Sequence, residues 1–280
     1  MLFNPPQSWG MRISNTSATR ISSSWGTGVT PGVAPSFGSW ATLISGSSVP
    51  SDIYEVGIMV HAGSTSATTR NVLMDIGIDP GGGTSFTTII PYLLCGHAGQ
   101  HNSGAPIFYR FPLYIPAGAS IGARAMGTAA TAFYVSLTAL GKPSNPDAIC
   151  CGTKVVSFGE TTASATGTTV TAGTTSEGAW TQLGSALTVP LWWWQTGLTA
   201  TDTTMTAQGY TLDLGIGDSS NKQIALLDVF VSFTASESIF NACAVQNGAL
   251  QAAVGGLVYG RVQCAGAADS ELSMMAWGLG

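Results

Sequence analysis

The sequence predicts an all-β protein made of two tandem copies of one β-sandwich. Residues 38–57 return as residues 178–197 at a constant spacing of 140, with Gly, Trp, Leu, Val, Pro and Gly at six matching positions. Short β-like runs, separated by Gly, Pro, Ser and Thr, fill both halves of the chain. No amphipathic helical pattern of about ten residues or more interrupts them.

The repeat sets the expected domain boundaries. Residues 1–18 form an N-terminal arm, 19–141 the first sandwich, 142–152 a linker that begins with the proline-containing segment KPSNPD, and 153–280 the second sandwich. Each copy is long enough to bury a core of its own. Trp40 and Pro50 should occupy the places in the first sandwich that Trp180 and Pro190 occupy in the second.

Further matches extend the repeat toward the end of each copy. Residues 75–78 return as 213–216, residues 89–90 as 226–227, and residues 121–125 as 258–262. About eight short strands per copy, joined by turns and without helices, indicate sandwiches of the jelly-roll type.

The composition excludes several classes of protein. Charged residues are only 8% of the chain and hydrophobic residues 45%, which is the reverse of a disordered protein. Nine scattered basic residues and a net charge of −5 argue against nucleic-acid binding. No apolar run reaches the roughly 18 residues of a membrane span, so membrane insertion is not expected. The start, MLFNPPQSWG, has no basic region typical of a signal peptide, so we expect synthesis in the cytoplasm without secretion.

Two motifs suggest chemistry but have simpler explanations. Ser120 lies in a G-x-S-x-G match, which in hydrolases needs a helix after the serine and a histidine later in the chain. Here strands flank the motif, and His61, His97 and His101 all precede it. His97 and His101 lie in a glycine-rich loop, where a polar loop tip is favoured over a metal site. The sequence therefore predicts no catalytic residue, no metal, no cofactor and no enzymatic activity.

Each copy places one arginine within an apolar strand. Arg124 and Arg261 are equivalent, and Asp75 and Asp213 are the equivalently placed acids. Because arginine is rarely buried without a partner, an Arg–Asp pair in each copy is one expectation. An arginine on an exposed strand face is the alternative.

The run Trp192, Trp193 and Trp194 is the most unusual feature of the chain. In a strand, alternate side chains face opposite sides, so Trp193 in the core would turn Trp192 and Trp194 outward. Contact with another chain is the favoured role, with sugar stacking or an ordinary core as alternatives. The arm, through apolar residues such as Leu2, Phe3 and Trp9, is expected to pack on a neighbouring chain.

The charge-poor, Gly/Ser/Thr/Ala-rich composition and the segment FPLYIPAGA through Arg124 resemble structural proteins of tailed-bacteriophage virions. The resemblance implies a tail-, neck- or fibre-associated jelly-roll protein that joins particle elements or presents a host-binding surface. It further implies location in the virion and contacts with other virion proteins and with copies of itself, most simply as a trimer. A capsid decoration protein and a carbohydrate-binding module that meets a host surface glycan through Trp192–Trp194 remain alternatives, and a hydrolase acting through Ser120 is a third.

Overall fold

The computed structural model describes residues 12–15, 26–61, 71–95, 107–130, 132–141, 151–200, 208–233, 241–246, 251–266 and 272–280. The arm residues Leu2, Phe3 and Trp9, most of the linker, and His97 and His101 lie outside them. His61 contributes a described backbone but no described side chain. Within the described ranges no helix is long and apolar enough to cross a membrane.

The described part of the first sandwich contains two sheets, antiparallel except for the short strand β3, which runs parallel to β9, and one short 3-10 turn, η1 (Gly46–Ser48). One sheet has the order β1-β10-β5-β8, with β2 also paired to β10, and its strands are β1 (Arg12–Ser14), β2 (Thr27–Val29), β5 (Ile53–His61), β8 (Ile107–Phe111) and β10 (Phe133–Gly141). The facing sheet has the order β3-β9-β6-β7, with β4 also paired to β9, and its strands are β3 (Gly32–Val33), β4 (Ala41–Ile44), β6 (Val72–Asp79), β7 (Thr87–Leu94) and β9 (Ser120–Gly127).

The second sandwich repeats this plan. One sheet has the order β11-β19-β14-β17, with β12 also paired to β19, and its strands are β11 (Val155–Phe158), β12 (Thr168–Val170), β14 (Trp193–Ala200), β17 (Asn241–Gln246) and β19 (Leu272–Leu279). The facing sheet has the order β13-β18-β15-β16, and its strands are β13 (Thr181–Gln182), β15 (Gln208–Gly217), β16 (Lys222–Phe233) and β18 (Leu257–Cys264).

The strand orders identify the fold. In both sandwiches eight main strands form two four-stranded sheets with the same order of partners, which is the jelly-roll arrangement. The counterpart of β13 in this order is β4, since both pair antiparallel with the next strand, whereas β3 is parallel to β9. The predicted all-β fold of two duplicated sandwiches is therefore confirmed. Pro50 and Pro190 are both exposed in the loops that lead into β5 and β14, which are equivalent strands.

One strand lies where the sequence suggests only an arm. Arg12–Ser14 forms β1, which pairs with the end of β10. The neighbouring Asn15 fixes this pairing, since its side-chain amide donates to the Val135 carbonyl at 2.8 Å and accepts from the Leu137 N–H at 2.7 Å. The sequence of this short segment shows no strand periodicity. It forms a strand because the open edge of β10 offers it hydrogen-bond partners.

The sequence match of residues 89–90 with residues 226–227 is one residue out of register. Ile90 lies opposite Ile76, and Leu226 lies opposite Leu214, so Ile90 and Leu226 are the true equivalents. Both are buried, whereas Leu227 is 57% exposed. The connection between β15 and β16 is shorter than the one between β6 and β7. The residue of β16 that lies opposite Leu214 therefore comes one position earlier than the sequence match implies.

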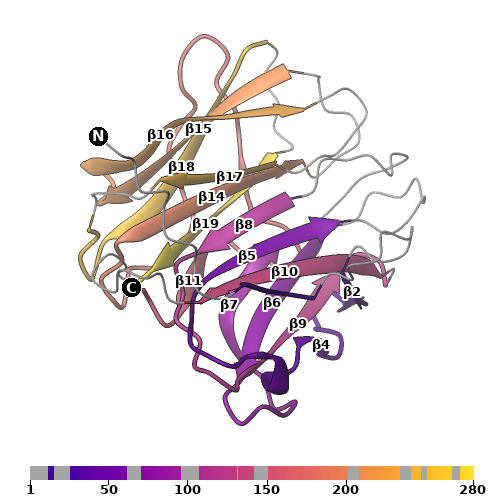
Figure 1. Ribbon diagram of the computed structural model, residues 1–280. Coiled ribbons are helices and arrows are strands. Elements are labelled where there is room, and N and C mark those ends of the chain that lie inside the picture. Colours follow the sequence, from indigo (N-terminus) through magenta and orange to yellow (C-terminus); the bar gives the residue numbers. More distant parts are fainter. Residues whose placement is uncertain are drawn as a thin grey trace, which may run out of the picture.

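The two sandwiches lie side by side (Figure 1), and buried apolar side chains of both form one cluster between them. The β14 and β19 sheet of the second sandwich packs against β7 and β8, the strands at the open side of the first. The Trp193 ring lies 5.1 Å from the Phe111 ring, and the Trp277 ring lies 5.3 Å from the Tyr109 ring. All eight residues of β19 are buried, because one face of this sheet fills its own sandwich and the other covers the first.

Candidate functional site

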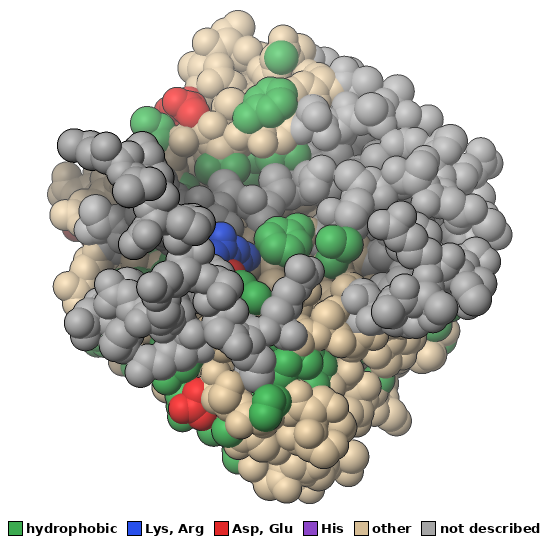
Figure 2. Space-filling view, viewed as in Figure 1, with side chains coloured by type: hydrophobic (Ala, Val, Ile, Leu, Met, Phe, Trp, Pro, Cys, Tyr) green, Lys and Arg blue, Asp and Glu red, His purple; other side chains and the backbone are tan. Residues whose placement is uncertain are grey.

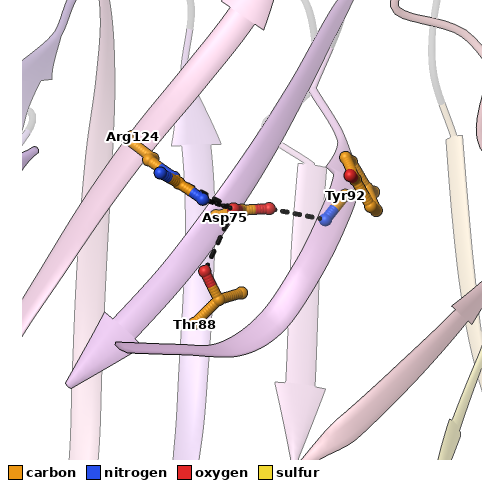
Figure 3. Close-up of polar contacts among 4 residues, drawn as sticks. All are labelled: Asp75, Thr88, Tyr92 and Arg124. Carbon is orange, nitrogen blue, oxygen red and sulfur yellow. Dashed lines mark hydrogen bonds and ion pairs between the residues drawn. The ribbon is translucent and has the colours of Figure 1, made fainter. Parts of the chain in front are cut away.

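An Asp–Arg pair lies on the outer face of each sandwich, and the first is drawn in Figure 3. Asp75 on β6 and Arg124 on β9 are direct cross-strand partners. Arg124 donates from Nε and Nη2 to one Asp75 oxygen at 3.1 and 2.9 Å, and the Thr88 hydroxyl donates to the same oxygen at 3.1 Å. The Asp75 side chain is only 4% exposed, so this pair is largely desolvated.

A β-bulge in β7 supplies the second Asp75 oxygen with a donor. The register between β6 and β7 shifts across Asp75, between Met74 and Ile76, and Tyr92 lies in the bulge with a φ of 52°. This left-handed backbone turns the Tyr92 N–H toward Asp75, to which it donates at 3.1 Å. The carboxylate therefore holds both the arginine and the bent strand.

Two aromatic rings pack against the guanidinium of Arg124. Its central carbon lies 4.3 Å from the Phe37 ring centre and 4.7 Å from that of Trp40. The Phe37 ring in turn stacks on Tyr92 at 5.8 Å. Gly77 permits this packing, because a Cβ there would come within 2.6 Å of the Trp40 ring. Cation–π contacts of this kind each contribute about 0.5–1 kcal/mol at the surface.

The second sandwich has the same cluster. Asp213 and Arg261 are cross-strand partners, with Nε of Arg261 donating to Asp213 at 2.8 Å. The bulge residue is Asp228, again with a φ of 52°, and its N–H donates to Asp213 at 2.8 Å. Trp180 lies over the guanidinium at 4.3 Å. Each predicted Arg and Asp therefore lies beside its partner in the structure.

Two substitutions distinguish the clusters. Glu177, which pairs with Nη1 of Arg261, stands where the first sandwich has Phe37. Asp228 stands where the first has Tyr92. Carboxylate oxygens of Glu177, Asp213 and Asp228 lie within 4.8 Å of one another. Partial desolvation and the two aspartates raise the pKa of Glu177, although the Arg261 charge opposes this.

The structure places two rings of the tryptophan run in the core, whereas strand alternation led us to expect Trp194 at the surface. Trp194 is fully buried among the side chains of the second sandwich, 6.0 Å from the Phe158 ring. Trp193 is 1% exposed and faces the first sandwich, and Trp192 is partly buried against the same core. Trp193 and Trp194 point to opposite faces of the sheet, but neither ring is exposed, because both faces are covered. Trp194 therefore has no surface to offer another chain, and the three rings form no platform for a sugar.

The Ser120 side chain has a structural role, because its hydroxyl connects two loops of the first sandwich. Its hydroxyl donates to the Gly82 carbonyl at 2.8 Å and accepts from the Gly46 N–H at 2.9 Å. The side chain is buried, and β9 rather than a helix follows it. These bonds tie the β6–β7 turn to η1 at one end of the first sandwich.

A cleft of about 350 Å³ opens between β11 and the loop before β14 in the second sandwich, lined by residues such as Phe158, Leu183, Leu187 and Glu160. Burial raises the pKa of the Glu160 carboxyl, against hydrogen bonds from its own backbone N–H and from Ser157. The charged form is therefore less favourable in the folded state than in the unfolded chain.

This pKa shift predicts a pH-dependent effect of Glu160→Gln. Wild-type stability should fall as the pH rises from the usual glutamate pKa of about 4.3 through the raised value. The variant lacks this loss, so its stability relative to wild type should increase between pH 4 and pH 7 in urea unfolding. Asp218→Asn is the control of opposite sign at lower pH, since backbone N–H groups of Asn221 and Ser220 lower the Asp218 pKa. Wild type should lose stability as the pH falls below the usual aspartate pKa of about 3.9, so this variant should gain stability relative to wild type there and not between pH 4 and pH 7. A constant difference between Glu160→Gln and wild type across this range would contradict the assignment.

The residues of the charged pairs were predicted from the sequence, but the residues that surround them were not. Phe37 and Glu177 can be recognised as equivalent from the sequence, because they directly precede the repeated Gly38 and Gly178. Tyr92 and Asp228 carry none, since only the bulge in each strand brings their backbone to the aspartate.

Neither a protein-family model nor a curated protein sequence matches this chain. Among solved structures, the chain is similar to the major capsid protein P2 of bacteriophage PM2, with a TM-score of 0.34, 8% identity, and coverage of 91% of this chain and 97% of that one. It is also similar to the N-terminal CBM22-1-CBM22-2 tandem domain of Paenibacillus barcinonensis Xyn10C, with a TM-score of 0.24, 11% identity, and coverage of 86% and 80%. Both likenesses are too weak to bear on function.

Proposed function

We propose that the chain is a non-enzymatic structural subunit of a bacteriophage particle that contacts copies of itself through the open side of its second sandwich. The observation that carries this proposal is β16, the last strand of its sheet. It exposes three large hydrophobic side chains, Ile224 (41%), Leu227 (57%) and Phe230 (68%). A long apolar edge strand of this kind is prone to pair with another chain.

The first sandwich supplies a template for the contact. Its own open side, formed by β7 and β8, is covered by the β14 and β19 sheet of the second sandwich. The strand order is the same in both copies, so β16 and β17 form the corresponding side of the second sandwich. A sheet from another copy of the chain fits this place.

The outer face of the β1-β10-β5-β8 sheet is suited to fill it. This sheet is the counterpart of the one that covers the first sandwich, and it exposes Met59 (40%) and Phe108 (49%). The Phe108 ring lies over Gly57, which is equivalent to the interface residue Gly197. Charged side chains are few on the described surface in Figure 2. Such head-to-tail contacts close into rings or continue as filaments, and a trimer is the arrangement we favour.

The place on the particle comes from the sequence resemblance. The segment from Phe111 to Arg124 supports a tail-, neck- or fibre-associated role that joins particle elements or presents a host-binding surface, with capsid decoration as the alternative. Mass spectrometry of purified particles and particle fractions distinguishes these positions. Absence of the chain from all particles would exclude both.

The self-contact is tested by adding charge to the edge strand. Phe230→Lys and Leu227→Lys should each abolish self-association in sedimentation velocity, because a lysine at the centre of an apolar contact must be desolvated. Val33→Lys is the matched control, since Val33 is 69% exposed on β3 of the first sandwich and away from both contact faces. If wild type is a monomer at high concentration, or if all three variants assemble equally, the proposed contact is wrong.

A further inference from the structure

The guanidinium of Arg124 has one free edge. Its Nε and Nη2 atoms donate to Asp75, whereas Nη1 has no acceptor among the residues that the structure describes. In the second sandwich the same atom of Arg261 is paired with Glu177. The Arg124 side chain is 31% exposed, against 19% for Arg261, so the free edge reaches the surface.

The difference lies in the side chain and not in the backbone. Phe37 and Glu177 precede Gly38 and Gly178, whose N–H groups donate to equivalent positions of β9 and β18 at 2.8 and 3.0 Å. The Phe37 ring lies over the face of the Arg124 guanidinium. Glu177 instead approaches the edge of Arg261, so the duplicated chain shows which group this edge binds.

The net charges of the two clusters also point to a carboxylate as the group that Arg124 binds. The second cluster sets three carboxylates, Glu177, Asp213 and Asp228, against Arg261 and the nearby Lys222, which leaves one net negative charge. The first cluster sets Asp75 against Arg124 and is neutral. One added carboxylate would give the first cluster one net negative charge, the same as the second cluster carries.

We infer that Arg124 binds one carboxylate from a partner protein, an aspartate or glutamate side chain placed toward Nη1 as Glu177 is placed in the second sandwich. That the partner is a protein of the assembled particle rests on the function proposed above. Asp75 and the two rings hold the guanidinium in place, so little side-chain entropy is lost on binding. Arginine beside aromatic rings is also typical of the centre of protein interfaces.

The packing favours a protein carboxylate over an acidic sugar. One face each of Phe37 and Trp40 is covered by the guanidinium. Tyr92 stacks on Phe37 at 5.8 Å, and Phe86 lies against Trp40 at 5.3 Å. Little ring face remains on which a sugar could stack, whereas the guanidinium edge is open to a single side chain.

The test uses the full chain labelled with 15N-arginine and the peptide acetyl-Gly-Glu-Gly-amide as probe. We expect a saturable shift of the Arg124 Nε–Hε signal and binding about tenfold weaker for the matched glutamine peptide, because the charge-assisted bond is lost. Phe37→Glu should supply the carboxylate internally and abolish the shift, whereas Phe37→Gln should retain it. Glu177→Gln should open the second cluster, so that Arg261 begins to respond.

Each other result overturns the inference. An Arg124 signal that does not move, that moves equally with both peptides, or that still moves in Phe37→Glu excludes a carboxylate site. Stronger binding of glucuronate than of the glutamate peptide would assign the site to an acidic glycan and exclude the protein partner. Because the titration measures ligand binding to Arg124, and sedimentation measures contact through β16, failure of one proposal is distinguishable from failure of the other.

Discussion

Replacing Trp277 with alanine should lower the free energy of unfolding by about 3–5 kcal/mol, the usual cost of removing a large buried aromatic side chain. Trp277 is fully buried, contacts Tyr109 of the first sandwich and lies over Gly197 of the second. The cavity would open between the two sandwiches, so their unfolding transitions should also separate. Urea unfolding followed by fluorescence and by circular dichroism measures both effects.

Trp277→Phe is the matched control for this prediction. It keeps an apolar ring in the interface and removes an indole N–H that has no hydrogen-bond partner among the described residues. We therefore expect a smaller loss than for alanine. Trp192→Ala should also cost less, since Trp192 is only partly buried. A Trp277→Ala chain that unfolds in one transition, with a loss below about 1 kcal/mol, would contradict the shared interface.

Replacing Asp75 with alanine should cost about 3 kcal/mol, because it leaves a partly buried arginine without its partner. The change also removes the acceptor for the Tyr92 N–H that closes the bulge in β7. Asp75→Asn should cost less, since its amide oxygen can still accept from that N–H. Chemical unfolding at pH 7 measures the three chains.

Asp213→Ala is the matched change in the second sandwich. Arg261 would keep Glu177 as a partner, so this variant should lose less stability than Asp75→Ala. Equal losses at the two positions would show that Glu177 does not compensate, and would weaken the comparison between the two clusters.

Much of the architecture is readable in the chain because it occurs twice. The spacing of Trp40 and Trp180 predicts two equivalent sandwiches, and the apolar alternation predicts their strands. The Asp–Arg pairs are also predictable, since an arginine within an apolar strand needs an acid at cross-strand distance. The place of the bulge is not, because Tyr92 and Asp228 have nothing in common as side chains.

The sequence by itself determined the β-class and the duplication, since these depend on local periodicity and on residues repeated at fixed spacing. It named the residues of the charged pairs but left open whether they meet. Only the tertiary structure decided what the tryptophan run does. Strand alternation assigns Trp193 and Trp194 to opposite faces, but whether a face is exposed depends on what packs against it. Here the first sandwich covers one face and the facing sheet covers the other, so both rings are buried. The same packing leaves β16 as the last strand of its sheet, with Leu227 and Phe230 exposed.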